Sequence, residues 1–222
     1  MTINVNGVEL YYEKSGSGKP IILLHGNGQD HTIFNGLIEK LSVNYTVYAI
    51  DSRDHGKSSK VKKLNYIDKM EDVYQFIKEL EIKKPAIFGF SDGGIIGLLL
   101  AINHPDVLSE LIVGGANTHP SGAKSFLMFL LKLMHFFTRN NKHELMLTQP
   151  NITNIELNSI ITPTLVVAGK NDFIKEEHTI SMAKNIPGSQ LKILEGEDHM
   201  SYVSDTEKIY TIITEFLGRT KI

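Results

Sequence analysis

The run Gly-Phe-Ser-Asp-Gly-Gly at residues 89–94 puts a serine between two glycines, each two positions away from it. The apolar residues 86–88 precede this run and the apolar residues 95–102 follow it, which predicts a buried strand, a tight turn and a buried helix. The two glycines would let the strand and the helix approach closely. Because such a turn holds a hydroxyl exposed in strained backbone, it favours a nucleophile at Ser91 over an ordinary turn with a capping Ser91 or Asp92.

The rest of the chain alternates apolar runs with stretches of helical periodicity. The Asn6-Gly7 pair predicts a hairpin between the first two strands. The predicted strands are residues 2–6, 8–14, 21–24, 46–50, 86–88, 111–113, 163–168 and 191–194. The predicted helices cover residues 30–42, 65–80, 95–102, 176–186 and 201–217. This order predicts an α/β fold: a mostly parallel eight-stranded sheet with helices on both faces and the hairpin as an antiparallel edge.

Polar groups directly follow five of the predicted strands. They are His25-Gly26-Asn27-Gly28, the run 51–58, Ser91, Gly169-Lys170-Asn171-Asp172 and Gly196-Glu197-Asp198-His199. In an open parallel sheet the carboxyl ends of the strands meet at one edge, and ligands bind there. A serine, an acid and a histidine are therefore expected on one edge of one sheet.

Together these motifs resemble the α/β-hydrolase family over essentially the whole chain. They are HGNG at 25–28, DSRDHGKS at 51–58, GFSDGG at 89–94, GKND at 169–172 and GEDH at 196–199. The resemblance implies Ser91 as the nucleophile, His199 as the general base and then acid, and Asp172 as the carboxylate that orients His199. It also implies an oxyanion hole formed by the backbone N–H groups of Asp92 and Asn27.

The chemistry of the side chains supports these roles. A serine hydroxyl needs a base within hydrogen-bond reach, and a histidine, with an ordinary pKa near ~6.5, can take the proton and return it to the leaving group. Asp198, Glu195 and Glu197 compete with Asp172 for contact with His199. Asp198 is adjacent to His199 in sequence, and neighbouring side chains in a loop seldom point at each other.

Several nearby residues have both a structural and a functional interpretation. HGNG could be a Gly-rich turn for close packing, and His25 is favoured as structural because one base suffices. Arg53, Asp54 and His55 are favoured as a structural loop, with Arg53 holding nearby carboxylates, over a second catalytic group or a metal site. Asp54 stands where the family usually has glycine.

Asp92 is the most informative departure from the family pattern, because many relatives carry Met, Leu or Gln after the nucleophile. A carboxylate there could recognise a cationic group such as the α-amine of an amino-acid ester. Some relatives with the same Ser-Asp-Gly-Gly run are similar to hydrolases of amino-acid esters. The favoured interpretation is a helix N-terminal carboxylate that the helix dipole stabilises.

Residues 117–158 interrupt the alternation where the family inserts its cap. We therefore expect an α/β-hydrolase core of residues 1–116 and 159–222 with a short helical cap at 117–158. Only Lys132 and His135 interrupt the apolar run 126–137, which a polar loop follows. This run is too apolar to face water and too short to span a bilayer, so we expect it to lie over Ser91 as a lid and to line an apolar acyl pocket. A homodimer contact and attachment to a lipid interface are the alternatives.

Composition excludes several classes of function. The chain of 222 residues contains no cysteine, which excludes disulfides, thiol nucleophiles and cysteine-based metal sites. A net charge of -2 gives no sign of binding to nucleic acid or to an anionic membrane. Neither a signal peptide nor an integral membrane segment is visible, so we expect a cytoplasmic protein. No cofactor and no metal is expected, because the remaining histidines lack ligand spacing: His31, His104, His119, His135, His143 and His178.

The sequence therefore predicts a serine hydrolase that cleaves a small carboxylic ester with an apolar acyl or alcohol group, through an acyl-enzyme and a Ser-His-Asp triad. The same residues would serve a cofactor-free perhydrolase or haloperoxidase, or a hydrolase of C–C bonds. A ligand-binding receptor or regulator that retains the triad is an alternative from another class of protein.

Overall fold

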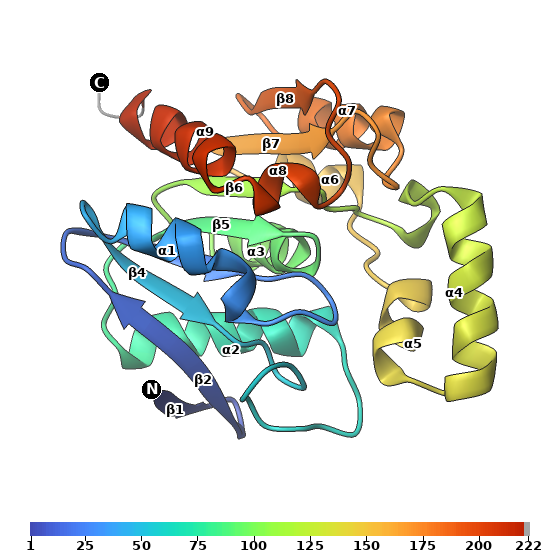
Figure 1. Cartoon of the computed structure of the whole chain (residues 1–222), viewed down its shortest axis with the longest axis horizontal. Coiled ribbons are helices and arrows are strands. Elements are labelled where there is room, and N and C mark those ends of the chain that lie inside the picture. Colours follow the sequence, from blue (N-terminus) through green and yellow to red (C-terminus); the bar gives the residue numbers. More distant parts are fainter. Residues whose placement is uncertain (220–222) are drawn as a thin grey trace.

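In a computed structural model that describes residues 1–219, eight strands form one sheet in the order β1-β2-β4-β3-β5-β6-β7-β8 (Figure 1). The strands are β1 (Thr2–Val5), β2 (Val8–Ser15), β3 (Lys19–Leu24), β4 (Tyr45–Ile50), β5 (Ala86–Phe90), β6 (Leu111–Gly114), β7 (Thr164–Gly169) and β8 (Gln190–Leu194). β1 and β2 pair antiparallel, β2 pairs antiparallel with β4, and the other pairs are parallel. The predicted α/β fold with its antiparallel edge is confirmed.

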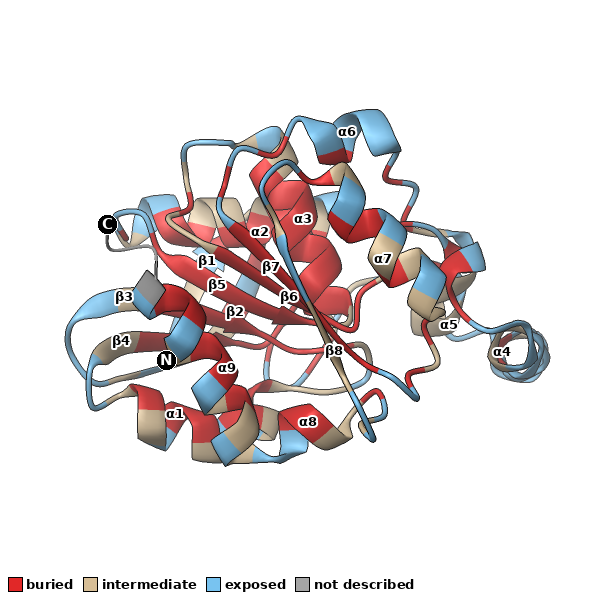
Figure 2. Cartoon of the chain, turned by 90° about the horizontal axis from the view of Figure 1, so that it is seen from above, coloured by how far each residue is buried: buried red, intermediate tan, exposed pale blue. Residues whose placement is uncertain are grey.

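Helices cover both faces of the sheet (Figure 2). One face carries α2 (Tyr66–Glu79), α3 (Asp92–Asn103), α6 (Asn154–Asn158) and α7 (Glu176–Asn185). The other face carries α1 (Asn35–Leu41), α8 (Ser201–Ser204) and α9 (Thr206–Arg219). The two remaining helices of the described chain, α4 (Ser125–Thr138) and α5 (Asn141–Thr148), lie at the end to which the parallel strands point, with α4 outermost (Figure 1).

Alternate side chains of the central strands enter two separate cores. Ile22 and Leu24 of β3 pack in the core that includes residues of α2 and α3. Ile21 and Leu23 pack in the core that includes residues of α1, α8 and α9. Successive side chains of a strand point to opposite faces, so a strand covered on both sides must be apolar throughout. This explains the continuous apolar runs of the sequence, and each such buried side chain contributes about 1.5–3 kcal/mol.

Two predicted helices are divided. A 3-10 helix, η1 (His31–Phe34), precedes α1, because the carboxylate of Asp30 accepts the amide of Thr32 at 2.9 Å and starts a tighter turn there. The predicted helix 201–217 is split into α8 and α9 at Asp205, whose backbone is extended with φ -79° and ψ 92°.

The segment 117–158, for which the sequence predicts one or two helices, contains the 3-10 helix η2 (Pro120–Gly122), α4, α5 and α6. Of the α4 side chains, Leu131 is the buried one. Figure 2 shows α4 end-on at the margin of the molecule, exposed around most of its circumference. The expectation that this apolar run avoids water is therefore wrong for its outer side, which no other element in residues 1–219 covers. Nor does any helix in the described part of the chain have the length and apolar character to cross a bilayer.

Candidate active site

Ser91 lies at the turn between β5 and α3. Its backbone has φ 53° and ψ -113°, a conformation that a serine adopts only under constraint. The constraint is the close approach of α3 to two strands: a Cβ at Gly89 in β5 would overlap the carbonyl of Gly93 in α3, and a Cβ at Gly93 would overlap the carbonyl of Leu24 at the end of β3. The predicted role of the two glycines is confirmed. The turn leaves Ser91 partly exposed while its neighbours are buried.

The three side chains predicted for catalysis lie in one hydrogen-bonded line. Oγ of Ser91 is 3.2 Å from Nε2 of His199, and Nδ1 of His199 is 2.8 Å from Oδ1 of Asp172. The serine hydroxyl donates to Nε2 and Nδ1–H donates to the carboxylate, which is the tautomer that a general base requires. Asp172 is buried after β7, and its Oδ1 also accepts the amide of Ile174 at 2.8 Å. The hydrogen bond from Ile174 holds the carboxylate of Asp172 in place.

Two aromatic rings hold the imidazole of His199. Its ring centroid lies 3.7 Å from that of Phe173 and 4.9 Å from that of Phe90. These contacts restrict rotation of the imidazole out of the line between Ser91 and Asp172.

The three acids that competed for contact with His199 lie elsewhere. Asp198 accepts the amides of Ser201 and Met200 at 2.9 and 2.8 Å, and these hydrogen bonds lower the pKa of its carboxyl. Glu197 is hydrogen-bonded to the hydroxyl of Ser201, and Glu195 is exposed. Asp198 therefore caps the turn that carries the histidine.

The residues predicted as oxyanion donors belong to segments that meet at Ser91. Asp92 is the first residue of α3, so its N–H has no acceptor inside the helix. The loop 25–28 runs against the serine, because a Cβ at Gly26 would lie 3.1 Å from Cβ of Ser91. The side chain of Asn27 is engaged, since its Nδ2 donates to the carbonyl of Lys142 in α5 at 3.0 Å. The hydrogen-bond donor with which Asn27 could bind an oxyanion is therefore its backbone N–H.

The carboxylate of Asp92, next to Ser91, forms a buried ion pair. Nζ of Lys69 in α2 donates to Oδ2 at 2.9 Å, and the hydroxyl of Tyr66 donates to Oδ1 at 2.6 Å. The side chains of Lys69 and Asp92 are 1% and 5% exposed. Burial, and then the charge of Asp92, raise the pKa of Tyr66, so its hydroxyl remains a donor.

Neither interpretation of Asp92 from the sequence anticipated this pair. The signal was present in α2, where Lys69 lies on the same helix side as the buried residues Tyr66, Met70 and Val73. A lysine on an apolar stripe needs a carboxylate partner, because a buried unpaired charge is costly. The position of Lys69 therefore indicates a buried acid, although the sequence alone does not say which one.

Two buried histidines hold the loops around Ser91. Nδ1–H of His25 donates to the carbonyl of Gly26 at 2.7 Å, and its Nε2 accepts the amide of Ser52 at 3.0 Å. Burial lowers the pKa of His25 to about 4. Burial, together with the charge of Lys69, lowers the pKa of His55 to about 3. His25 thus joins two loops as a neutral ring, which is the structural role favoured from the sequence.

Arg53 holds carboxylates, as predicted. Its Nε and Nη2 donate to the two oxygens of Asp72 at 2.6 and 2.5 Å, and its Nη1 lies 3.3 Å from Oδ2 of Asp68. Both acids belong to α2, so this forked pair fastens the loop 51–58 to that helix.

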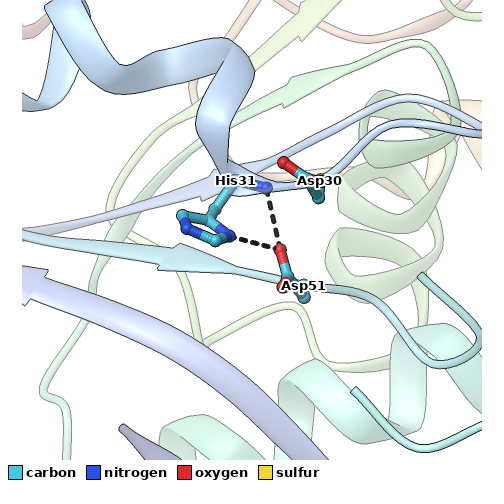
Figure 3. Close-up of side chains that lie close together, drawn as sticks. All are labelled: Asp30, His31 and Asp51. Carbon is cyan, nitrogen blue, oxygen red and sulfur yellow. Dashed lines mark hydrogen bonds and ion pairs between the residues drawn. The ribbon is translucent and has the colours of Figure 1, made fainter. Parts of the chain in front are cut away.

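A second cluster of titratable side chains lies at the start of the same loop (Figure 3). Oδ1 of Asp51 accepts the backbone amide of His31 at 2.8 Å and lies 2.7 Å from its Nδ1. Nε2 of His31 is 3.2 Å from Oε1 of Glu13. Ligand atoms of Asp30, His31 and Asp51 lie within 4.8 Å of one another, a grouping that was not predicted. Both ring nitrogens face carboxylate oxygens, which suits hydrogen-bond donors, whereas a metal ligand must offer a lone pair.

A hollow of about 20 Å³ lies over Ser91. This volume has room for about one water molecule, which needs at least ~10–15 Å³, so no substrate fits over Ser91 in this structure. Both the core and the segment 117–158 contribute to its walls. They are Tyr66, Ser91, Asp92, Asn117, Pro120, Ala123, Leu127, Met128, Met146, Gln149, Phe173 and Ile174. The inner side of α4 therefore reaches the hollow, although its outer side faces solvent.

Comparison with known proteins gives a family and a fold. A family model described as the alpha/beta hydrolase fold matches residues 19–145. The protein named serine hydrolase BPHL of Homo sapiens is 24% identical over 97% of this chain and 85% of its own length. A thermophilic esterase from Thermogutta terrifontis matches with a TM-score of 0.83 at 22% identity, over 100% of both chains. The meta-cleavage product hydrolase CumD from Pseudomonas fluorescens matches with a TM-score of 0.82 at 18% identity, over 100% of this chain and 98% of its own.

Burial of neutral histidines should make the fold less stable in acid. The pKa of His25 is about 4 in the folded chain against an ordinary value of 6.5. Below the ordinary value the unfolded chain binds a proton that the folded chain does not, so the free energy of unfolding decreases as pH falls toward ~4. For His25 the decrease is on the order of 3 kcal/mol. Thermal unfolding followed by circular dichroism should show the midpoint falling over this pH range. His25→Gln should flatten the fall and the exposed His119→Gln should not; equal slopes would contradict the assignment.

Loss of one member of the Lys69–Asp92 pair should destabilise the fold more than loss of both. Lys69→Met leaves a charge buried without its partner, so we expect the free energy of unfolding to drop by about 3–5 kcal/mol. Lys69→Met combined with Asp92→Asn should recover most of this loss in chemical denaturation. Lys170→Met is the matched control, because it breaks an exposed pair with Glu176 that should contribute ~0–1 kcal/mol. Equal losses in the single and the double variant would argue against the pair.

Proposed function

The chain belongs to the alpha/beta hydrolase fold family and is a hydrolase of that fold, and we propose that it cleaves a small carboxylic ester through an acyl-enzyme formed on Ser91. The observation that carries the proposal is the line of contacts from Ser91 Oγ to His199 Nε2, at 3.2 Å, and from His199 Nδ1 to Asp172 Oδ1, at 2.8 Å. A nucleophile, a base and a group that orients the base are the parts that this chemistry needs.

In the first half of the reaction, Oγ of Ser91 attacks the carbonyl carbon of the ester while its proton moves to Nε2 of His199. The carbonyl oxygen becomes an oxyanion, which the N–H groups of Asp92 and Asn27 bind. The carboxylate of Asp172 stabilises the imidazolium that has formed. When the intermediate collapses, the C–O bond to the alcohol breaks and His199 returns the proton to the leaving oxygen.

In the second half, water replaces the alcohol. His199 takes a proton from this water, whose oxygen attacks the carbonyl carbon of the acyl-enzyme. The same two amides bind the second oxyanion. Collapse breaks the bond to Oγ, the proton returns from Nε2 to Ser91, and the carboxylic acid leaves.

The walls of the hollow over Ser91 favour an uncharged substrate with an apolar acyl or alcohol group. Leu127, Met128, Met146 and Phe173 supply apolar surface, and the two methionines can adapt to different shapes. A substrate amine would have to compete with Lys69 for the carboxylate of Asp92. We therefore do not assign amine recognition to this acid.

The segment 117–158 serves in this proposal as the cap of a core formed by residues 1–116 and 159–222. Side chains of both parts enclose the hollow over Ser91. Because that hollow is smaller than any ester, substrate must displace side chains of α4 or α5 when it enters.

Removal of the nucleophile or of the orienting acid should abolish ester turnover. Ser91→Ala and Asp172→Asn should each lower kcat by at least roughly 10³-fold on an activated short-chain ester, because each removes one part of the relay. The matched controls are the exposed Ser181→Ala, and Asp198→Asn, which keeps a cap beside His199. A spectrophotometric assay with p-nitrophenyl esters measures the effect.

Covalent labelling distinguishes an ester hydrolase from a receptor that retains the triad. A fluorophosphonate should label the unmodified chain on Ser91 and should not label Ser91→Ala. Labelling without turnover of any ester in a panel would contradict ester hydrolysis and favour a receptor that retains the triad. Full activity of Ser91→Ala would contradict the nucleophile.

Enlarging the hollow should shift the preferred acyl length. Met146→Ala removes a side chain from the wall above Ser91, so the ratio of kcat/KM for a six-carbon over a two-carbon acyl ester should rise roughly tenfold. Met134→Ala is the matched control, because that methionine is 48% exposed and does not line the hollow. An unchanged ratio in Met146→Ala would show that the acyl group lies elsewhere.

A further inference from the structure

One side of α4 presents a continuous apolar surface to solvent. Seven large apolar side chains of this helix are between 37% and 75% exposed, and besides Met134 they are Phe126, Phe129, Leu130, Leu133, Phe136 and Phe137. The spacings of three and four residues among these last six put them on the same side of the helix. We call this set the outer face of α4. Folded proteins usually turn such a stripe toward their core, and a contiguous exposed patch of this kind marks an interaction site.

The opposite side of α4 is already occupied. Leu131 is buried, and Leu127 and Met128 line the hollow over Ser91. The helix packs against α5, which is held to the core in turn by the bond from Asn27 to the carbonyl of Lys142. The chain thus fixes α4 by its inner side and holds the outer face away from its own core (Figure 2).

The charge of this region selects the kind of partner. Residues 111–143 contain no aspartate and no glutamate, although the chain as a whole has a net charge of -2. Lys124, Lys132 and Arg139 of this stretch are exposed. The guanidinium of Arg139 lies 5.7 Å from the ring centroid of Phe136. Lys132 and Phe129 line one hollow of about 400 Å³. Cations therefore border the outer face.

We propose that the outer face of α4 docks on an anionic lipid surface. Phenylalanine and leucine side chains would enter the boundary between headgroups and acyl chains, where interfacial helices bury ~5–10 Å of their apolar side. The bordering lysine and arginine side chains would meet the lipid phosphates. At 14 residues, α4 is about 21 Å long and would lie along the interface.

A second copy of the chain fits this face less well. Symmetric packing of two outer faces would bring the bordering cations of both copies together, with no acid of residues 111–143 to neutralise them. An anionic bilayer supplies both the apolar phase and the opposite charge.

Vesicle flotation with the whole chain tests the proposal without reference to catalysis. We expect the chain to float with vesicles that mix phosphatidylcholine and phosphatidylglycerol, and to bind pure phosphatidylcholine vesicles at least tenfold more weakly. Raising the ionic strength should weaken the binding to the mixed vesicles, because surface charges are screened.

Paired variants separate the apolar and the charged contributions. Phe129→Ser with Leu133→Ser should lower the partition coefficient to mixed vesicles at least tenfold, because both side chains are lost from the lipid phase. Lys132→Glu with Arg139→Glu should lower it to a similar extent. The matched controls are Ile155→Ser with Ile161→Ser, which are exposed apolar residues outside α4, and Lys78→Glu with Lys184→Glu, which are exposed lysines of α2 and α7.

Three outcomes would overturn the proposal. The first is equal binding to neutral and mixed vesicles. The second is binding that both α4 double variants retain. The third is a dimer in light scattering that Phe129→Ser with Leu133→Ser converts to a monomer while the unmodified chain fails to float, which would assign the outer face to a second copy. The altered residues of α4 are exposed, so we expect every variant to fold. Circular dichroism of each variant checks this.

Discussion

The close approach of β5 and α3 is the constraint on which the site depends. Because Gly89 has no Cβ, β5 and α3 meet, and because Gly93 has none, α3 also lies against the end of β3. The residue that joins β5 to α3 therefore has no room for relaxed backbone. A serine held at positive φ in such a sparsely populated conformation costs ~1–3 kcal/mol. The flanking residues offset this cost, because β5 is buried along its length and α3 is buried from residue 92 to residue 101. The backbone strain is thus located at Ser91, whose hydroxyl must point out of the core.

The ionisable side chains around this turn are either paired with an opposite charge or uncharged. Asp92 forms an ion pair with Lys69, and Arg53 forms one with Asp72. Burial keeps His25 and His55 without charge. Water has little access to these groups, so each charge relies on its partner for stabilisation. The packing that encloses the turn is therefore compatible with several ionisable side chains close to the serine.

Much of this architecture could be predicted from the sequence, for identifiable reasons. A strand covered on both faces is apolar throughout, so β3, β5 and β6 are visible as short runs, and side chains that follow such strands must gather at one edge. This reasoning placed Ser91, Asp172 and His199 at one edge, the family resemblance implied their roles, and the structure brings the three side chains into contact. The resemblance to a known family added the oxyanion donors.

What the sequence did not predict depends on partners far away along the chain. The pairing of Lys69 with Asp92 joins two helices, and only their packing decides which acid a buried lysine meets. α4 is exposed because no other element in residues 1–219 covers its outer side. The local sequence of a helix does not indicate whether another element will cover it. The division at Asp205 rests on a single extended residue inside an otherwise helical pattern.

The bond from the side chain of Asn27 to the carbonyl of Lys142 has a consequence for how such a chain can change during evolution. α4 touches the rest of the chain through few side chains, so substitutions on its outer side can accumulate at little cost to folding. α5 must keep its position, because the carbonyl of Lys142 in its first turn supports the loop beside Ser91. Adjacent helices of one short segment should therefore tolerate substitution unequally, and new surface properties can arise on α4 without a change in the contacts around Ser91.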